Sequence, residues 1–269
     1  MKKKLNILTV SYLLFLILLF LSGSTFGILS EVIYLLAFVL PFALALYRTR
    51  EERVPRASYL TLNSEKISFT LPIIAPTVSV VMLISLLTSL LIFALTGKGN
   101  TVDVGDSFFA ALLSHALLPA VLEEMLFRYL PMRLLAQHSK RGAVIASAFF
   151  FALVHHDLYT IPYSFIAGVI FMTVDIVTDS VIPSVIIHFI NNAVSVGLLI
   201  YASNSAFAPI IYIILGILTI ISLCFIFVRK KSYLEKLSLS FDKGEGFKIT
   251  TEMLIFAGLT LSLAVLSLI

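Results

Sequence analysis

Polar residues whose types could do chemistry together lie inside three long apolar stretches. Glu123, Glu124 and Arg128 lie in the run EEMLFR, and the other two groups are FALVH at 151–155 and HFINN at 188–192. Charged side chains near the centre of a bilayer cost several kcal/mol, so they usually have a partner and a function. A carboxylate beside an imidazole can deprotonate water, and a histidine with an asparagine can donate hydrogen bonds to an oxyanion. Together these residue types predict a site where water attacks an amide.

Helix geometry separates the members of the first group. Glu124 and Arg128 are four residues apart, so they share one face of a helix and are expected to form an ion pair. Glu123 projects about 100° away from Glu124 and therefore stays available for chemistry. Pro119, four residues before Glu123, removes a helical hydrogen bond and is expected to open the helix there.

The other two groups repeat the spacing of four residues. Phe151 is expected to pack beneath the ring of His155, while His188 and Asn192 present two side chains in one direction. The neighbouring His156 leaves open which of the two adjacent histidines faces the site. A single histidine inside a membrane is more often a packing residue, and asparagines can simply form hydrogen bonds across helices.

Depth in the membrane brings the three groups together. Counted from the cytoplasmic ends of their apolar stretches, Glu123 lies roughly 18 Å deep and His155 roughly 20 Å deep. Asn192 lies about 16 Å deep and His188 about 10 Å deep. We therefore expect these four side chains to meet at one level in one cavity. Asp175 lies near the end of its stretch and is expected at the membrane surface.

The apolar stretches around these residues predict an integral membrane protein. Of the 269 residues, 59% are hydrophobic and 13% are charged, and the mean hydropathy is +1.06, whereas soluble proteins carry about 25% charged residues. Open sheet edges do not occur in lipid, so we expect an all-α, polytopic transmembrane helical bundle with about 8–9 spans. The first stretch has no signal-peptide cleavage site and is interpreted as an uncleaved span. The candidate spans are 5–22, 28–47, 71–95, 108–135, 142–157, 161–178, 181–201, 206–228 and 253–269.

Basic residues predict the orientation of the chain. They gather at the amino terminus and after the second, fourth and eighth candidate spans, all on one side, while the opposite loops contain only Lys98. Because Lys and Arg favour cytoplasmic loops, we expect a cytoplasmic N-terminus and a multi-pass protein of the cell membrane. Topology thus accounts for the net charge of +4, and no nucleic-acid partner is expected. The residues concerned are Lys2, Lys3, Lys4, Arg48, Arg50, Arg53, Arg56, Lys66, Arg133, Lys140, Arg141, Arg229, Lys230, Lys231, Lys236, Lys243 and Lys248.

The three runs, taken in order, are similar to the motifs of a known family. EExxxR at 123–128, FxxxH at 151–155 and HxxxN at 188–192 resemble those of the CAAX-processing and bacteriocin-processing (CPBP, or Abi) intramembrane proteases, which include the Ras and a-factor converting enzyme. The resemblance covers about residues 107–201, interpreted as the catalytic core of a single transmembrane domain, 1–269. It implies cleavage, within the lipid bilayer, of a membrane-associated protein or peptide. Such a substrate is a CAAX-like tail, a bacteriocin or pheromone precursor, or a membrane-bound regulator.

The resemblance also implies roles for individual residues. The mechanism is expected to depend on glutamate, with Glu123 activating water with the help of His155. His188 and Asn192 are expected to stabilise the oxyanion. No cofactor is expected, but zinc stays open, because two histidines and a glutamate can bind zinc and many family members are labelled metalloproteases. The expected catalytic residues are Glu123, Glu124, His155, His188 and Asn192, supported by Arg128 and Phe151.

Two other functions are compatible with the same polar residues. Intramembrane Glu and His also form the proton relays of proton-coupled transporters, although the internal repeats common in transporters are not found in this sequence. The chain could also be a non-catalytic membrane scaffold or immunity protein. Other protease motifs, H-E-x-x-H, G-x-S-x-G and G-x-G-D, do not occur in the sequence.

Overall fold

The computed structural model describes residues 1–50, 58–97, 107–201, 206–241 and 249–266. Every regular element in these ranges is a helix, so the predicted all-α fold is confirmed. Some of the residues used to predict the orientation lie outside the described ranges, namely Arg53, Arg56, Lys98, Lys243 and Lys248.

Seven helices in the described ranges are long and apolar enough to cross a membrane, which makes the chain a multi-pass membrane protein. The two remaining predicted spans form shorter helices, α7 (Lys140–Leu153) and α12 (Thr251–Leu266). The 14 residues of α7 extend over only about 21 Å, whereas the hydrocarbon core of a bilayer is about 30 Å thick. The seven long helices are α1 (Lys2–Gly23), α2 (Ile28–Arg48), α3 (Ser64–Thr96), the segment Phe108–Leu134, α8 (Ile161–Thr178), α9 (Ile182–Ile200) and α10 (Phe207–Val228).

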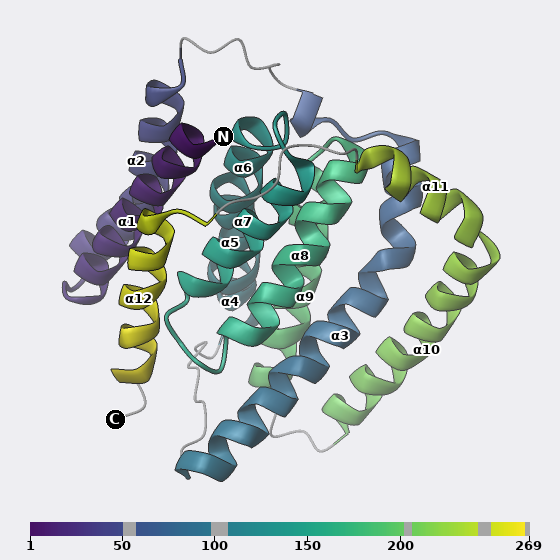
Figure 1. The fold of residues 1–269 in the computed structure, drawn as a ribbon. Coiled ribbons are helices and arrows are strands. Elements are labelled where there is room, and N and C mark those ends of the chain that lie inside the picture. The colour runs from purple at the N-terminus through teal and green to yellow at the C-terminus, as the bar shows by residue number, and fades with distance from the viewer. Residues whose placement is uncertain (51–57, 98–106, 202–205, 242–248, 267–269) are drawn as a thin grey trace.

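The helices form a central group with a flank on each side (Figure 1). α1, α2 and α12 make one flank, α3 and α10 make the other, and the segment Phe108–Leu134 lies between them with α7, α8 and α9. α10 packs on α3, where the hydroxyl groups of Ser79 and Thr219 lie 2.8 Å apart. No residue of α10 is buried by the protein, as expected for a helix that faces lipid.

Helix ends that carry basic residues gather at one end of the bundle (Figure 1). Four helix ends or helices lie there: the start of α1, the end of α2, the start of α3 and the surface helix α11 (Lys230–Ser240). The short 3₁₀ helix η1 (Ser58–Leu60) precedes α3. Lys236 Nζ of α11 lies 2.9 Å from Glu65 Oε1 of α3, and Lys66 Nζ donates to the carbonyl of Asp179 at 3.1 Å. The helix ends used in the orientation argument thus share one end of the molecule where the structure describes them.

The segment with the paired glutamates is not a regular α-helix. Two π-helical turns interrupt it, and each is followed two residues later by a proline, Pro119 or Pro131. Proline has no N–H to close an α-helical hydrogen bond, so the predicted opening at Pro119 takes the form of a π-turn, a feature frequent at functional sites. In chain order the pieces are α4 (Phe108–Ala111), the π-turn η2 (Leu112–Leu117), α5 (Leu118–Glu124), the π-turn η3 (Met125–Tyr129) and α6 (Leu130–Leu134).

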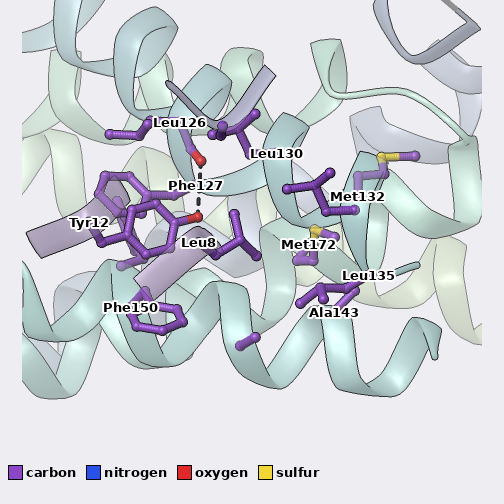
Figure 2. Close-up of a cluster of buried hydrophobic side chains, with 14 of the residues drawn as sticks. Leu8, Tyr12, Leu126, Phe127, Leu130, Met132, Leu135, Ala143, Phe150 and Met172 are labelled. Carbon is purple, nitrogen blue, oxygen red and sulfur yellow. Dashed lines mark hydrogen bonds between the residues drawn. The ribbon is translucent and has the colours of Figure 1, made fainter. Parts of the chain in front are cut away.

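Side chains from two other helices satisfy the carbonyl groups of the second π-turn. The Tyr12 hydroxyl donates to the carbonyl of Leu126 at 3.1 Å (Figure 2), and Ser147 Oγ donates to that of Phe127 at 2.5 Å. Residue 131 would supply the α-helical donor for Phe127, but it is a proline. The buried ring of Tyr12 also stacks on Phe127, with centroids 4.9 Å apart. These contacts join α1 and α7 to the part of the chain that follows the glutamates.

α7 and α8 pack closely against each other at a glycine. A Cβ atom at Gly168 of α8 would lie 2.8 Å from Ala148 Cα of α7, so a larger residue requires the two backbones to separate. Small residues allow such close packing between membrane helices. Phe151 lies one turn beyond Ala148 on α7, so this contact also determines where α7 holds the FxxxH run.

Candidate active site

Glu124 is the buried centre of the polar network. Its Oε2 atom lies 3.2 Å from Arg128 Nε, which is the ion pair expected from their spacing, and both side chains are fully buried. Its Oε1 atom lies 2.7 Å from His188 Nδ1. Glu124 therefore links its own segment to α9 through a contact between residues 64 positions apart.

Aromatic rings hold the Arg128 guanidinium in place. Its central carbon lies 4.1 Å from the centroid of the Phe151 ring and 5.5 Å from that of Phe171. A cation over a ring face is stabilised, and more strongly where water is excluded. The guanidinium is thus held by one carboxylate and two rings. Phe151 has this contact in addition to its predicted packing on His155. Phe171 had not been expected at the site, because a single phenylalanine in an apolar stretch carries no signal in the sequence.

Glu123 differs from Glu124 in exposure. The Glu123 side chain is 18% exposed, whereas that of Glu124 is 0% exposed. Glu123 Oε2 lies 3.8 Å from His188 Nε2, beyond hydrogen-bonding distance. The His188 ring therefore lies between the two carboxylates, bonded to the buried one and turned toward the open one. Of the pair, only Glu123 can reach a water molecule or a substrate.

His155, and not His156, belongs to this group of side chains. Its ring packs edge-on against Phe151 with centroids 5.0 Å apart, and the Phe151 ring in turn lies 5.8 Å from that of His188. His155 Nδ1 lies 2.7 Å from the carbonyl of Phe151; since a carbonyl only accepts, Nδ1 carries the proton and Nε2 is free to accept one. His156 instead lies at the end of α7 with φ of 39° and contacts the carbonyl of Val154.

Asn192 lies one turn beyond His188 on α9 but outside this network. In the described part of the chain, its hydrogen bond is with its neighbour, as Asn191 Nδ2 donates to Asn192 Oδ1 at 3.2 Å. No hydrogen bond joins Asn192 to Glu123 or His155 among the described residues. His188 therefore contacts the glutamates, whereas Asn192 forms no hydrogen bond with Glu123 in the described part of the chain.

Asp175 lies near the end of α8, as the sequence predicts, but the sequence argument did not predict its burial by the protein. It was expected at the membrane surface, but it is fully buried, and its Oδ1 atom accepts a hydrogen bond from the Ser184 N–H at 3.1 Å. Ser184 lies in the first turn of α9, one turn before His188. The segment near Tyr59 contacts the chain just before α9, where the Tyr59 carbonyl accepts a hydrogen bond from the Val181 N–H at 2.8 Å. Asp175 therefore anchors the start of the helix that carries His188.

The residues at the site do not make a zinc site as arranged. Among the described residues, no group of three or more His, Cys, Asp or Glu side chains lies in a position to hold a metal ion. His188 Nδ1 is bonded to Glu124 and His155 Nδ1 to a backbone carbonyl, so only the Nε2 atoms of these two rings could bind a metal. A zinc site typically needs three protein ligands.

One part of the chain is similar to a known protein family. Residues 105–194 match a family model described as type II CAAX prenyl endopeptidase Rce1-like. This stretch of the chain is therefore similar to an Rce1-like domain. This domain covers about a third of the chain, contains all three motifs and nearly coincides with the expected core at 107–201. The predicted resemblance to the CPBP family is thus confirmed, and the match supports CAAX-type intramembrane proteolysis in general. No significant match is found among curated proteins or among solved structures.

Proposed function

We propose that this protein is an intramembrane endopeptidase of the cell membrane that uses Glu123 to activate water. The observation that carries the proposal is the pair of adjacent glutamates with opposite environments. Glu124 is fully buried and held by Arg128 and His188, while Glu123 is partly open and faces His188 Nε2 at 3.8 Å. A buried ion pair beside an open carboxylate leaves one group for structure and one for chemistry.

The chemical steps follow from the hydrogen-bonding capacity of these groups. A water molecule between Glu123 and His155 donates one hydrogen to the carboxylate and is oriented by the lone pair of His155 Nε2. Glu123 takes the proton as the water oxygen forms a bond to the carbonyl carbon of the substrate, and the carbonyl electron pair moves to its oxygen. The intermediate then collapses, the C–N bond breaks, and Glu123 returns the proton to the leaving amine.

Asn192 and His188 are the proposed donors to the oxyanion. The Asn192 side chain lies one turn from His188 on α9, and its amide Nδ2 group can donate while its Oδ1 accepts from Asn191. His188 donates its Nδ1–H to Glu124, so Nε2 is able to donate only when the ring carries a second proton. Preorganised donors of this kind stabilise the charge that develops in the transition state.

The proposed substrate is a membrane-associated protein or peptide, such as a CAAX-like tail, a bacteriocin or pheromone precursor, or a membrane-bound regulator. The bond that is cut must reach Glu123, which lies within the segment Phe108–Leu134 that is long and apolar enough to cross the membrane. A polypeptide anchored in the same bilayer reaches this depth without crossing open lipid. The Rce1-like domain agrees with a substrate of this class.

Comparative peptidomics tests the proposal directly. Membranes with the wild-type protein, with Glu123→Gln and without the protein are compared for new peptide termini after tryptic digestion. We expect a set of cleaved termini that appears only with the wild-type protein, because glutamine keeps the shape of the side chain but cannot take a proton from water. The same termini in membranes with the Glu123→Gln protein would contradict the proposed role of Glu123. Their absence from all membranes would contradict the protease itself.

A further inference from the structure

A cavity far along the chain from the glutamates lies between the first two helices. It has a volume of about 510 Å³ and lies at the end of the bundle where α1 begins and α2 ends. None of the residues that line it belongs to the proposed active site. The proposed proteolytic reaction therefore does not account for this cavity.

Three positively charged side chains line the rim of this cavity. Lys2 and Lys3 come from the first turn of α1, and Arg48 comes from the last turn of α2. Within the described residues, none of the three has a carboxylate within 4 Å. Glu252 of α12 accepts a hydrogen bond from Asn6 at 3.0 Å and interacts electrostatically with Lys2. The rim thus keeps a surplus of positive charge.

The floor of the cavity is apolar and opens to the bilayer. Ile7, Val10 and Leu44 line it, and Val10 is 53% exposed. Between Lys3 and Val10 the helix rises about 10 Å. A charged rim above an apolar floor of this depth matches a phosphate group followed by glycerol and the first part of an acyl chain.

We propose that this cavity binds an anionic phospholipid, with Lys2, Lys3 and Arg48 around the headgroup phosphate and the acyl chain along Val10 and Leu44. Both helices that form it are long and apolar enough to cross the membrane, so the occupant comes from the bilayer. Basic pockets between transmembrane helices suit anionic headgroups, since each Lys or Arg near the membrane surface contributes about 1 kcal/mol to their binding. A free phosphate ion would use the rim but not the floor.

Native mass spectrometry of the purified full-length protein tests this inference. Phosphatidylglycerol and phosphatidylcholine with the same acyl chains are titrated separately, and the bound fraction is measured. We expect the wild-type protein to bind phosphatidylglycerol more tightly than phosphatidylcholine. In the triple variant Lys2→Gln, Lys3→Gln, Arg48→Gln this preference should fall about 100-fold, because each removed cation lowers the affinity about fivefold. The matched control is Arg229→Gln, Lys230→Gln, Lys231→Gln, which removes the same charge at the same end of the bundle but outside the cavity. It should keep the affinity of the wild-type protein.

A second variant keeps every charge and fills the floor instead. Leu44→Trp is expected to lower the affinity for phosphatidylglycerol at least tenfold, and it remains a test if the charge variants fail to insert. Gel filtration and a melting curve verify that each variant is folded. An equal loss in the control triple variant, unchanged binding in Leu44→Trp, or displacement of the lipid by millimolar inorganic phosphate would overturn the proposal. Each of these results indicates general surface charge or a free-anion site instead of a lipid cavity.

Discussion

At the scale of single residues, the two adjacent glutamates are held by different forces. Glu124 is fully buried, with Arg128 Nε at 3.2 Å and His188 Nδ1 at 2.7 Å, so its charge is compensated by specific partners. Glu123 is 18% exposed, and the His188 Nε2 atom lies 3.8 Å from its Oε2 atom, beyond hydrogen-bonding distance. A buried charge that loses its partner destabilises a protein by about 3–5 kcal/mol, whereas a partly open carboxylate can lose its charge at little structural cost.

Substitutions of the two glutamates should therefore separate activity from folding. Glu123→Gln is expected to abolish turnover and leave the yield of folded protein nearly unchanged. Glu124→Gln and Arg128→Ala are expected to lower both, because each leaves one member of a buried pair without its partner. Turnover of a labelled substrate and the monodisperse fraction on gel filtration measure the two effects. An equal loss of folded protein in all three variants would assign a structural role to Glu123 as well.

The oxyanion donors should affect the transition state more than the bound substrate. Asn192→Ala is expected to lower kcat by about 10²–10³ with a nearly constant KM, since the donor acts on charge that appears only in the transition state. Asn191→Ala is the matched control, because the same amide is removed about 100° around α9, and its effect should be milder. Steady-state kinetics with both variants give the comparison. A raised KM at unchanged kcat in Asn192→Ala would show that this residue holds the substrate.

Metal removal provides a further measurement at the scale of residues. We expect strong zinc chelators to leave the purified protein active, because Glu123 and His155 act on water directly in the proposed mechanism. The zinc content by mass spectrometry and the turnover are measured before and after chelation. Stoichiometric zinc that is lost together with activity, and that restores activity when it is returned, would contradict this mechanism.

At the scale of helices, the site depends on how closely neighbouring elements approach. The second π-turn places the carbonyl groups of Leu126 and Phe127 where Tyr12 of α1 and Ser147 of α7 donate to them. α7 is held in turn against α8 at Gly168, over the backbone of Ala148. Since the FxxxH run begins in the last turn of α7, these contacts determine the distance between that run and the glutamates.

Gly168→Ala is expected to lower the melting temperature and the turnover together. The new Cβ atom would lie 2.8 Å from Ala148 Cα, so α7 and α8 must separate, and overpacking of this kind destabilises by about 1–3 kcal/mol. Gly216→Ala in α10 is the control, since nothing lies within 4 Å of a Cβ atom there. In a helix interior, alanine is more favourable than glycine by about 1 kcal/mol, so the control should be neutral or stabilising. Equal melting temperatures in the two variants would contradict the importance of this close approach.

At the scale of the whole molecule, the helix ends that carry basic residues lie at one end of the bundle, and the loop between α1 and α2 lies at the other (Figure 1). The positive-inside rule assigns the basic end to the cytoplasm. The proposed phospholipid cavity lies at this same end, beside Lys2, Lys3 and Arg48. Orientation and lipid binding thus depend on the same group of charges.

Cysteine labelling tests the orientation. The single Cys224 is first replaced by serine, and Ser24→Cys or Ser232→Cys is then introduced. Both serines are exposed, Ser24 between α1 and α2 and Ser232 in α11. In intact cells, a membrane-impermeant maleimide should label the variant at position 24 at once and the variant at position 232 only after permeabilisation. The opposite pattern would place the N-terminus outside the cytoplasm.

Several features of this protein were determined by the sequence itself. The stretch predicted at 161–178 is α8, and the stretch predicted at 206–228 is α10 apart from its first residue, because a span is defined by the length of a local apolar run. The ion pair of Glu124 and Arg128 also followed from local spacing, since residues four apart share a helix face. The order of the three motifs was sufficient to indicate the family.

Only the tertiary structure decided which groups face one another. The bond between His188 and Glu124, the exposure of Glu123, the burial of Asp175 and the contact of Tyr12 with the π-turn all depend on how helices are rotated and placed against each other. The spacing of residues in the sequence determines the relative directions of side chains on one helix, but it does not determine the angle between two helices. The depth of a residue in the membrane can be counted along the chain, whereas the rotation of a helix about its axis depends on packing. The packing of α9 places His188 between the two carboxylates.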